Sequence, residues 1–447
     1  MTRARRMPSA KTLVPPALEG EPAIPPGWPQ SSARGFQAFF VEDGQGVSAR
    51  FRGYKAASAF QPIYSIAHRK PVGYEALLRA YAEDGTVVPP TDFFAGAASE
   101  AETALLDGLC WSLHARNFLS LGEEVSWLFL NISPATAIRG EHYGEYLSEL
   151  TRQLGLATQR LVIEVLEDAV ADKRALAESV AFFKKLGCLV AIDDFGAGHS
   201  NFDRIWQLAP DIVKFDRSVI AQATRNPTVV RMLPNLVNLI HEAGCLALIE
   251  GIESEEEALI AVGSGIDFVQ GYYFGRPAQN PFVSPSTGAG GIDLLCEKFK
   301  AFSEHKRALR QLELARYKSG LVHAARAIAS GVPFEQACAE LMRHPRIERC
   351  FLLDQAGTQL DHNLEASHRR DVGQARFLPV AGTAGANWSR RPYFQRAIVA
   401  PGEVQCTRPY LSVTGARMCI TLSLALREGA HLRVLCCDLA CDADSCL

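Results

Sequence analysis

Between residues 51 and 280 the sequence repeats one order of features: a short apolar run, a polar residue at its end, and then a helical stretch. The run 188–192, for example, ends on the adjacent carboxylates Asp193 and Asp194, and a loop containing Gly196 and Gly198 follows. Strands that alternate with helices form mostly parallel sheets. Because the repeat fills about 230 residues, the sequence predicts a closed (β/α)₈ barrel rather than an open sheet.

The polar residues at the strand ends define a candidate site, because the carboxyl ends of barrel strands converge on one face. Six carboxylates and one ammonium group meet there, and they cannot all stay ionised without cations. Oxygen ligands favour Mg²⁺ or Mn²⁺, and two such ions promote attack at phosphorus. Taken singly, each side chain could be a surface acid or a turn residue. The joint pattern favours a metal-dependent phosphodiesterase or phosphatase built from Glu75, Asn131, Glu164, Asp193, Asp194, Lys214, Glu250, Glu253 and Gln270.

Several short motifs in this region resemble, in their order, those of the EAL domain family. They are Glu75-Ala76-Leu77, Asn131-Ile132-Ser133-Pro134, Glu164-x-x-Glu167, Asp193-Asp194-Phe195-Gly196, Lys214-Phe215-Asp216, Glu250-Gly251-Ile252-Glu253 and Gln270-Gly271-Tyr272. The resemblance implies a modified TIM barrel that hydrolyses cyclic di-GMP to linear pGpG. It also implies a requirement for Mg²⁺ or Mn²⁺, with two ions bound, and a homodimer formed through the barrel.

The resemblance also implies a role for each matching position. The metal ligands would be Glu75, Asn131, Glu164, Asp193, Asp194 and Glu250. The catalytic groups would be Lys214, which would contact the nucleophilic water, together with Asp194, Glu250 and Glu253. The substrate would contact Gln61, Leu77, Arg79 and Gln270, and Glu167 would brace the loop after Asp194.

The loop after Asp194 departs from the family pattern at His199 and Asn201. These departures leave two alternatives open: a catalytically weak or inactive receptor for cyclic di-GMP, and a regulatory scaffold that acts through partner proteins.

The rest of the chain suggests three further parts. Residues 1–50 are predicted to be a disordered, basic and proline-rich tail. Residues 51–280 would form the barrel, and residues 281–330 a linker and one long connecting helix. Residues 331–447 resemble the smaller α/β domain of PAS/Cache-like sensors.

The C-terminal domain contains aromatic, arginine and aspartate residues that could line a ligand pocket. Such a pocket would suit a small zwitterion or a carboxylate. The alternative is that these side chains are core residues and that the domain only dimerises. The predicted pocket residues are Trp388, Arg391, Tyr393, Tyr410 and Asp438.

Charge and hydropathy limit the partners. The formal net charge is −3, so no global positive field attracts a nucleic acid polymer. No apolar run reaches the roughly 18 residues of a membrane helix. No signal-peptide core follows the N-terminal arginines, so we expect a cytoplasmic protein without a membrane partner.

Overall fold

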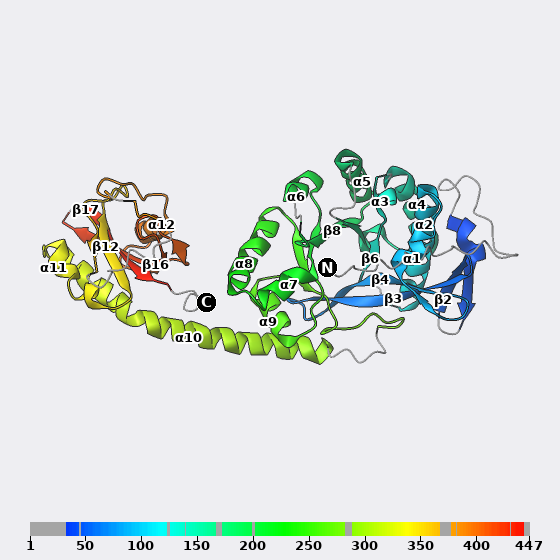
Figure 1. Cartoon of the computed structure of the whole chain (residues 1–447), viewed down its shortest axis with the longest axis horizontal. Coiled ribbons are helices and arrows are strands. Elements are labelled where there is room, and N and C mark those ends of the chain that lie inside the picture. The colour runs from blue at the N-terminus through cyan, green and yellow to red at the C-terminus, as the bar shows by residue number, and fades with distance from the viewer. Residues whose placement is uncertain are drawn as a thin grey trace, which may run out of the picture. The chain divides into compact units, whose positions relative to one another are not determined.

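The computed structural model describes residues 33–43, 46–122, 126–138, 140–166, 172–198, 202–281, 288–366, 377–380, 382–429 and 431–441. The chain divides into two compact units, residues 1–300 and 301–447. Helix α10 (Gly288–Ala329) contributes residues to both units (Figure 1).

The first unit contains a closed barrel of eight strands. In spatial order these are β3, β11, β10, β9, β8, β7, β6 and β4, and β4 pairs again with β3. Strand β3 is antiparallel to both of its neighbours, whereas the other pairs are parallel. The predicted barrel is confirmed, in a modified form. Its strands are β3 (Tyr54–Ser65), β4 (Lys70–Tyr81), β6 (Trp127–Asn131), β7 (Leu161–Leu166), β8 (Leu189–Phe195), β9 (Ile212–Phe215), β10 (Leu246–Ile249) and β11 (Phe268–Val269).

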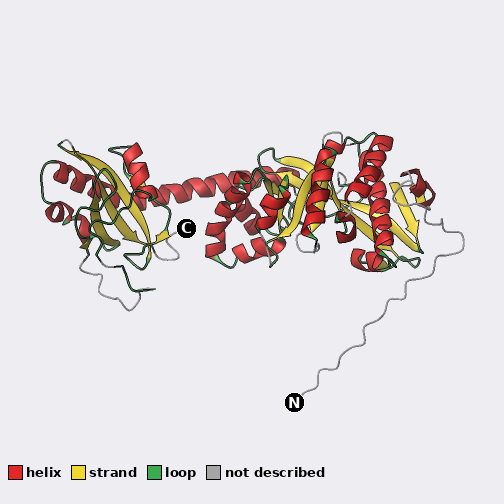
Figure 2. Cartoon of the chain, turned by 90° about the horizontal axis from the view of Figure 1, so that it is seen from above, coloured by secondary structure: helices red, strands yellow, loops and turns green. Residues whose placement is uncertain are grey.

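Helices surround these strands (Figure 2). Two helices, α1 and α2, follow one another between residues 90 and 120. Ser99 begins the second helix because its side chain accepts a hydrogen bond from the backbone N–H of Glu102. The helices are α1 (Pro90–Ala95), α2 (Glu100–Ser120), α3 (Pro134–Ala137), α4 (Gly140–Leu154), α5 (Lys173–Lys185), α6 (Asp203–Leu208), α7 (Arg217–Ala223), α8 (Pro227–Glu242) and α9 (Glu255–Gly263).

The core of the barrel consists of one buried side chain from most of its strands. Phe129 and Phe268 are the large members, and beta-branched and aliphatic side chains fill the space between them. Inward-facing residues on successive strands stack in layers, so the interior is packed and the polar residues are confined to the rim. The layer comprises Ile63, Phe129, Val162, Ala191, Ile212, Leu248 and Phe268.

The prediction of a disordered tail through residue 50 is wrong for the part of that segment that the structure describes. A 3₁₀ helix η1 (Ala33–Phe39) precedes β1 (Phe40–Asp43) and β2 (Gly46–Phe51), and β2 pairs with β3. Phe36 and Phe39 are buried in the core. Burial of these two aromatic rings offsets the entropy lost when this short segment becomes ordered. Residues 1–32 lie outside the described residues.

The second unit is built on an antiparallel sheet with the order β13-β12-β17-β16-β14, and β15 pairs with β16. The predicted smaller α/β domain after a long helix is confirmed. The strands are β12 (Ile347–Leu353), β13 (Leu364–Glu365), β14 (Gln405–Cys406), β15 (Tyr410–Leu411), β16 (Met418–Glu428) and β17 (His431–Ala440). The helices of this unit, besides α10, are α11 (Phe334–Cys338), η3 (Leu341–Arg343) and α12 (Pro392–Val399). The first unit also contains β5 (Val87–Val88) and the 3₁₀ helix η2 (Thr158–Arg160).

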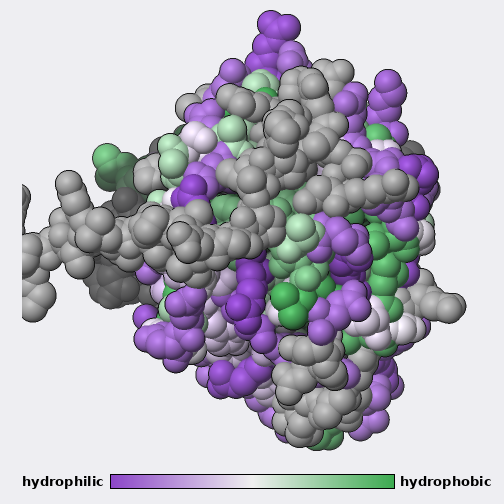
Figure 3. All heavy atoms as spheres, turned by 90° about the vertical axis from the view of Figure 1, so that its right-hand side faces the viewer, coloured by the Kyte–Doolittle hydropathy of each residue, from purple (hydrophilic) through white to green (hydrophobic). Residues whose placement is uncertain are grey.

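Within the described segments, none of the helices combines the length and the apolar character that crossing a bilayer requires. Among the coloured residues of the face in Figure 3, hydrophilic ones predominate, and hydrophobic residues lie in small groups between them.

Candidate active site at the carboxyl end of the barrel

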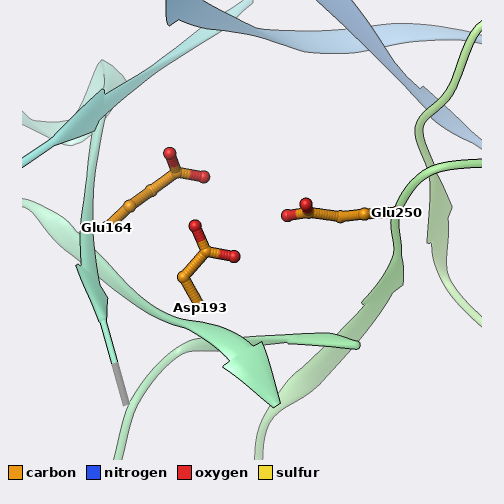
Figure 4. Close-up of side chains that lie close together, drawn as sticks. All are labelled: Glu164, Asp193 and Glu250. Carbon is orange, nitrogen blue, oxygen red and sulfur yellow. The ribbon is translucent and has the colours of Figure 1, made fainter. Parts of the chain in front are cut away.

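Three carboxylates meet at the mouth of the barrel. Glu164 lies on β7, Asp193 on β8, and Glu250 directly after β10. One carboxylate oxygen of each lies within 4.8 Å of the others. Figure 4 shows the three side chains pointing toward one another, with Glu250 facing the other two. This spacing allows the three groups to share one cation.

Lys214 on β9 is the ammonium group that accompanies these acids, and its side chain is fully buried. Its Nζ lies 3.2 Å from Asp193 Oδ1 and 2.5 Å from Glu250 Oε1, and it also pairs with Glu164. Burial alone would lower the pKa of Lys214, but the surrounding carboxylates raise that pKa well above its ordinary value. The lysine is therefore positively charged among the acids.

The donor set at this site fits a divalent metal ion. Burial, and then the nearby acids, raise the pKa of Glu164 well above its ordinary value, although Lys214 opposes this. Glu164 Oε2 is buried and has no hydrogen-bond or ion-pair partner among the described residues. A buried carboxylate oxygen without a partner is costly, and a bound cation would remove that cost. Because the donors are oxygen atoms, Mg²⁺, Mn²⁺ and Ca²⁺ fit them better than zinc.

A second group of predicted residues is organised around Glu75 on β4. Glu75 Oε1 accepts a hydrogen bond from Asn131 Nδ2 at 3.0 Å, and Oε2 accepts one from Gln270 Nε2 at 2.6 Å. Gln270 Nε2 also lies 3.3 Å from Gln61 Oε1, and Gln61 is paired in register with Glu75 across β3 and β4. These contacts bring four predicted residues from four strands together and fix the direction of the Glu75 carboxylate.

Asp194 has an unusual backbone conformation. Its φ is +57°, in the left-handed region, and the pairing of β8 with β9 shifts register at this point. The backbone N–H of Asp194 donates to Asp193 Oδ1 at 2.9 Å. Burial, and then the neighbouring Asp193 and Asp216, raise the pKa of Asp194. The residue still keeps contact with solvent, and its carboxylate is not one of the three that cluster within 4.8 Å.

Other predicted residues lie around this centre. Leu77 and Arg79 share the Glu75 face of β4, because alternate residues of a strand point the same way, and Arg79 Nη1 donates to the carbonyl of Leu78. Glu253 lies apart from the cluster, and its half-exposed carboxylate pairs with Arg217 Nη2 at 2.8 Å. The predicted Glu167, and the departures His199 and Asn201, lie outside the described residues.

Sequence reasoning did not identify Arg217. This residue begins α7, two residues after β9. Its position directly after Lys214-Phe215-Asp216 is the signal that could have placed it near the barrel mouth.

In the second unit, a cavity is lined by four of the five predicted pocket residues: Trp388, Arg391, Tyr393 and Tyr410. Asp438 does not line it. Asp438 is buried on β17 and is bound by Arg349, a cavity residue that the sequence did not single out. The available signal was a charged pair, Glu348 and Arg349, directly before the apolar run 350–353 of the same strand.

The fold and the acidic mouth of the barrel define a class of protein. The EAL domain family model matches residues 47–277, and the chain belongs to this family. YkuI of Bacillus subtilis, described as an uncharacterized EAL-domain containing protein, is 28% identical over 359 residues, which are 76% of this chain and 83% of YkuI.

A crystal structure of YkuI in complex with cyclic di-GMP, described as its substrate, and calcium is similar in fold. The TM-score is 0.73 at 22% identity, and the match covers 87% of this chain and 96% of YkuI. The cyclic di-GMP phosphodiesterase RocR of Pseudomonas aeruginosa is 27% identical over 226 residues. That match covers 49% of this chain and 56% of RocR, so it concerns little more than half of that relative.

Proposed function

We propose that this chain binds cyclic di-GMP at the carboxyl end of its barrel and hydrolyses it to linear pGpG. The observation that carries the proposal is the convergence of Glu164, Asp193 and Glu250 around Lys214. Two relatives support it: RocR is named a cyclic di-GMP phosphodiesterase, and YkuI has been crystallised with cyclic di-GMP and calcium.

Glu164, Asp193 and Glu250 would hold a divalent ion, and Glu75 with Asn131 and the exposed Asp194 would complete two metal positions. When bound, Mg²⁺ or Mn²⁺ would stabilise the negative charge that develops on the phosphoryl oxygens. The carboxylates are already held in place, since Glu75 accepts hydrogen bonds from Asn131 and Gln270. Little reorganisation would then be needed when the ion binds.

The reaction is the addition of water across one phosphodiester bond. The water oxygen forms a bond to phosphorus, the bond from phosphorus to the ribose 3′ oxygen breaks, and that oxygen takes up a proton. Lys214 would stabilise the attacking oxygen as its charge develops. Arg79 and Gln61 would orient the dinucleotide, because a guanidinium binds phosphate and an amide can bind a base.

Hydrolysis of cyclic di-GMP by the full chain with Mg²⁺ or Mn²⁺ tests this proposal, with pGpG separated by chromatography. Glu164→Gln replaces a proposed metal-binding carboxylate at the centre of the site with a neutral amide and should lower the rate by about 10²-fold or more. Glu178→Gln is the matched control, since Glu178 is exposed on α5 and pairs only with Arg174 among the described ion pairs.

Linear pGpG from the wild type and the control, but not from Glu164→Gln, is the expected result. Saturable binding of cyclic di-GMP without any product would overturn the hydrolase and identify a receptor. If the chain neither binds nor hydrolyses cyclic di-GMP, only the scaffold alternative would remain. The homodimer implied by the resemblance stays a prediction. The molecular mass from sedimentation of the same samples tests it.

A further inference from the structure

A wide groove lies at the amino end of the barrel, opposite the candidate active site. Its described lining comes from the starts of β4, β6, β10 and β11, from the end of the antiparallel β3, and from the last turn of α9. The groove has a volume of about 1150 Å³. Ligand pockets usually measure roughly 300–1000 Å³, so this groove has room for a large or elongated molecule.

The floor of the groove is apolar. Trp127 and Phe268 both line it, and their rings form an edge-to-face pair with centroids 5.9 Å apart. Phe268 belongs to the packed layer inside the barrel, and the half-buried Trp127 and Val72 pack against that layer. Leu246, at the start of β10, is 37% exposed. The barrel core therefore continues into the groove, and an apolar ligand there would shield these side chains from water.

Two polar side chains in the lining already have partners within the protein. Ser65 Oγ lies 2.9 Å from His68 Nδ1. Asp267 Oδ2 accepts a hydrogen bond from the backbone N–H of Ala247 at 2.8 Å and lies 2.8 Å from His241 Nε2. Because these groups are engaged, a ligand with polar groups along its length would gain little from them and would lose its own hydrogen bonds to water. A hydrocarbon chain has no such bonds to lose.

A positive charge lies at the edge of the groove. Lys70 begins β4, is exposed and belongs to the lining. The preceding Arg69 pairs with Asp293 at 3.2 Å, whereas none of the ion pairs between described residues includes Lys70. Asp267, the acidic residue of the described lining, already has His241 as its partner. The unpaired charge is therefore that of an ammonium group, which attracts an anion.

We propose that this groove binds a free long-chain fatty acid, with the hydrocarbon chain on the floor formed by Trp127 and Phe268 and the carboxylate beside Lys70 Nζ. A single carboxylate matches the single unpaired ammonium group of the lining. Lys70 and Val72 both line the groove, so the charged edge is continuous with the apolar floor along β4. The site is separate from the acidic mouth, which lies at the other end of the barrel.

Titration calorimetry on the full chain tests the proposal with octanoate, decanoate and dodecanoate, each kept below the concentration at which it forms micelles. Two further methylene groups in contact with the floor should tighten binding roughly 10-fold at each step of this series. Decanol is the uncharged match to decanoate, and decylamine carries the opposite charge. We expect decanoate to bind more tightly than decanol, and decanol more tightly than decylamine.

A charge variant tests the position of the carboxylate. Lys70→Gln should weaken decanoate binding about 3-fold and leave decanol binding unchanged, since an exposed ion pair contributes only a modest amount. Lys173→Gln is the matched control, because Lys173 is exposed at the start of α5 and does not line the groove.

Tryptophan fluorescence tests the position of the chain. A bromine atom quenches a nearby indole ring, so 11-bromoundecanoate should quench Trp127 in a saturable way. Trp127→Phe should abolish this quenching. Trp206→Phe should retain it, because Trp206 is a 65% exposed residue on α6 and does not line the groove.

Saturable binding that tightens with chain length, favours decanoate over decylamine and quenches Trp127 would support the proposal. Four results would overturn it: no saturable binding of dodecanoate, equally tight binding of decylamine and decanoate, equal effects of Lys70→Gln and Lys173→Gln, or quenching that persists in Trp127→Phe. Binding to phosphatidylglycerol vesicles without binding of monomeric dodecanoate would also overturn it, because the groove would then contact a membrane surface. The readout is binding at the amino end, so it is independent of whether the barrel hydrolyses cyclic di-GMP.

Discussion

Lys214 places a positive charge among three acids. Its removal is the most direct single-residue test of how this charge stabilises the buried carboxylates at the barrel mouth. In Lys214→Met the buried Glu164 and its neighbours lose their described cation. Removing one member of a buried ion pair costs about 3–5 kcal/mol, and we expect a loss of that order in the free energy of unfolding without metal. Urea unfolding measures it.

Lys185→Met is the matched control, because Lys185 is exposed on α5 and should change stability by less than about 0.5 kcal/mol. Added Mn²⁺ should raise the melting temperature of Lys214→Met by more than that of the wild type, since the ion would replace the missing charge. An equal rise in both proteins would argue against a metal held by these acids.

The buried Asp107 on α2 should make the stability of the fold depend on pH, independently of the groups at the barrel mouth. Burial raises the pKa of Asp107 to about 6, although Ser133 and Thr136 donate hydrogen bonds to it. The folded protein therefore holds a proton on this group that the unfolded chain has released. Stability from this group is greatest below 3.8, the ordinary pKa of an aspartate, and declines as the pH rises through about 6.

The comparison of wild type with Asp107→Asn isolates this effect, because asparagine keeps an acceptor oxygen and does not titrate. Relative to the variant, the wild type should lose roughly 2 kcal/mol of unfolding free energy between pH 4 and pH 7. Urea unfolding at several pH values measures the difference. A difference that is constant with pH would contradict the prediction.

At the residue scale, the sequence indicated which residues lie near the barrel mouth, but not which side chains contact one another there. Glu75, Asn131 and Gln270 end or line separate strands, and the structure joins them through hydrogen bonds. Glu253 fits the same motif pattern but pairs with Arg217. Motif spacing identifies which residues approach the mouth, whereas the partner of each side chain depends on rotamers and neighbours that the pattern does not contain.

At the scale of elements, the conformation of the loop after β11 requires a glycine at position 271. Gly271 has φ +155°, and a Cβ at this position would overlap the backbone of Ile252. Ile252 N donates to Gln270 O, so a shift of this loop would move Gln270 away from Glu75. Gly271→Ala should cost about 1–3 kcal/mol from overpacking and lower any turnover of cyclic di-GMP.

Gly265→Ala is the matched control. Gly265 also has a positive φ, +79°, but no atom lies within 4 Å of the added Cβ. It should cost roughly 1–2 kcal/mol from backbone strain alone and leave turnover unchanged. Equal effects on turnover would show that the close approach to Ile252 does not position Gln270.

The alternation of strands and helices sufficed to predict the barrel, because period and length are local properties. The antiparallel pairing of β3 with β4 follows from the short connection between the two strands. The folding of residues 33–43 and 46–50 was not predictable from these local patterns. Proline is the commonest residue in the stretch 1–32, and this composition obscured the short aromatic segment that follows. Burial of Phe36 depends on a surface that only the folded barrel provides.

At the scale of the whole molecule, each unit has its own core, and α10 is divided between them. Ile292 and Leu295 at the start of α10 are buried against α9 and the barrel, whereas Leu314 and Tyr317 belong to the core of the second unit. The first unit therefore needs the beginning of α10 but not the second sheet. We expect residues 1–300 to fold and to retain whatever turnover the full chain shows.

A chain that ends at residue 287 should be much less stable than one that ends at residue 300. It lacks Ile292 and Leu295, and burial of two such side chains contributes about 3–6 kcal/mol. Within the full chain, Leu295→Ala should cost about 2–5 kcal/mol, whereas its neighbour Leu294, which is 52% exposed, should tolerate alanine at less than about 0.5 kcal/mol. Thermal unfolding of the two truncations and the two variants measures these differences. Equal stability of the truncations would mean that the start of α10 is not part of the barrel's core, and the boundary between the two units would then precede this helix.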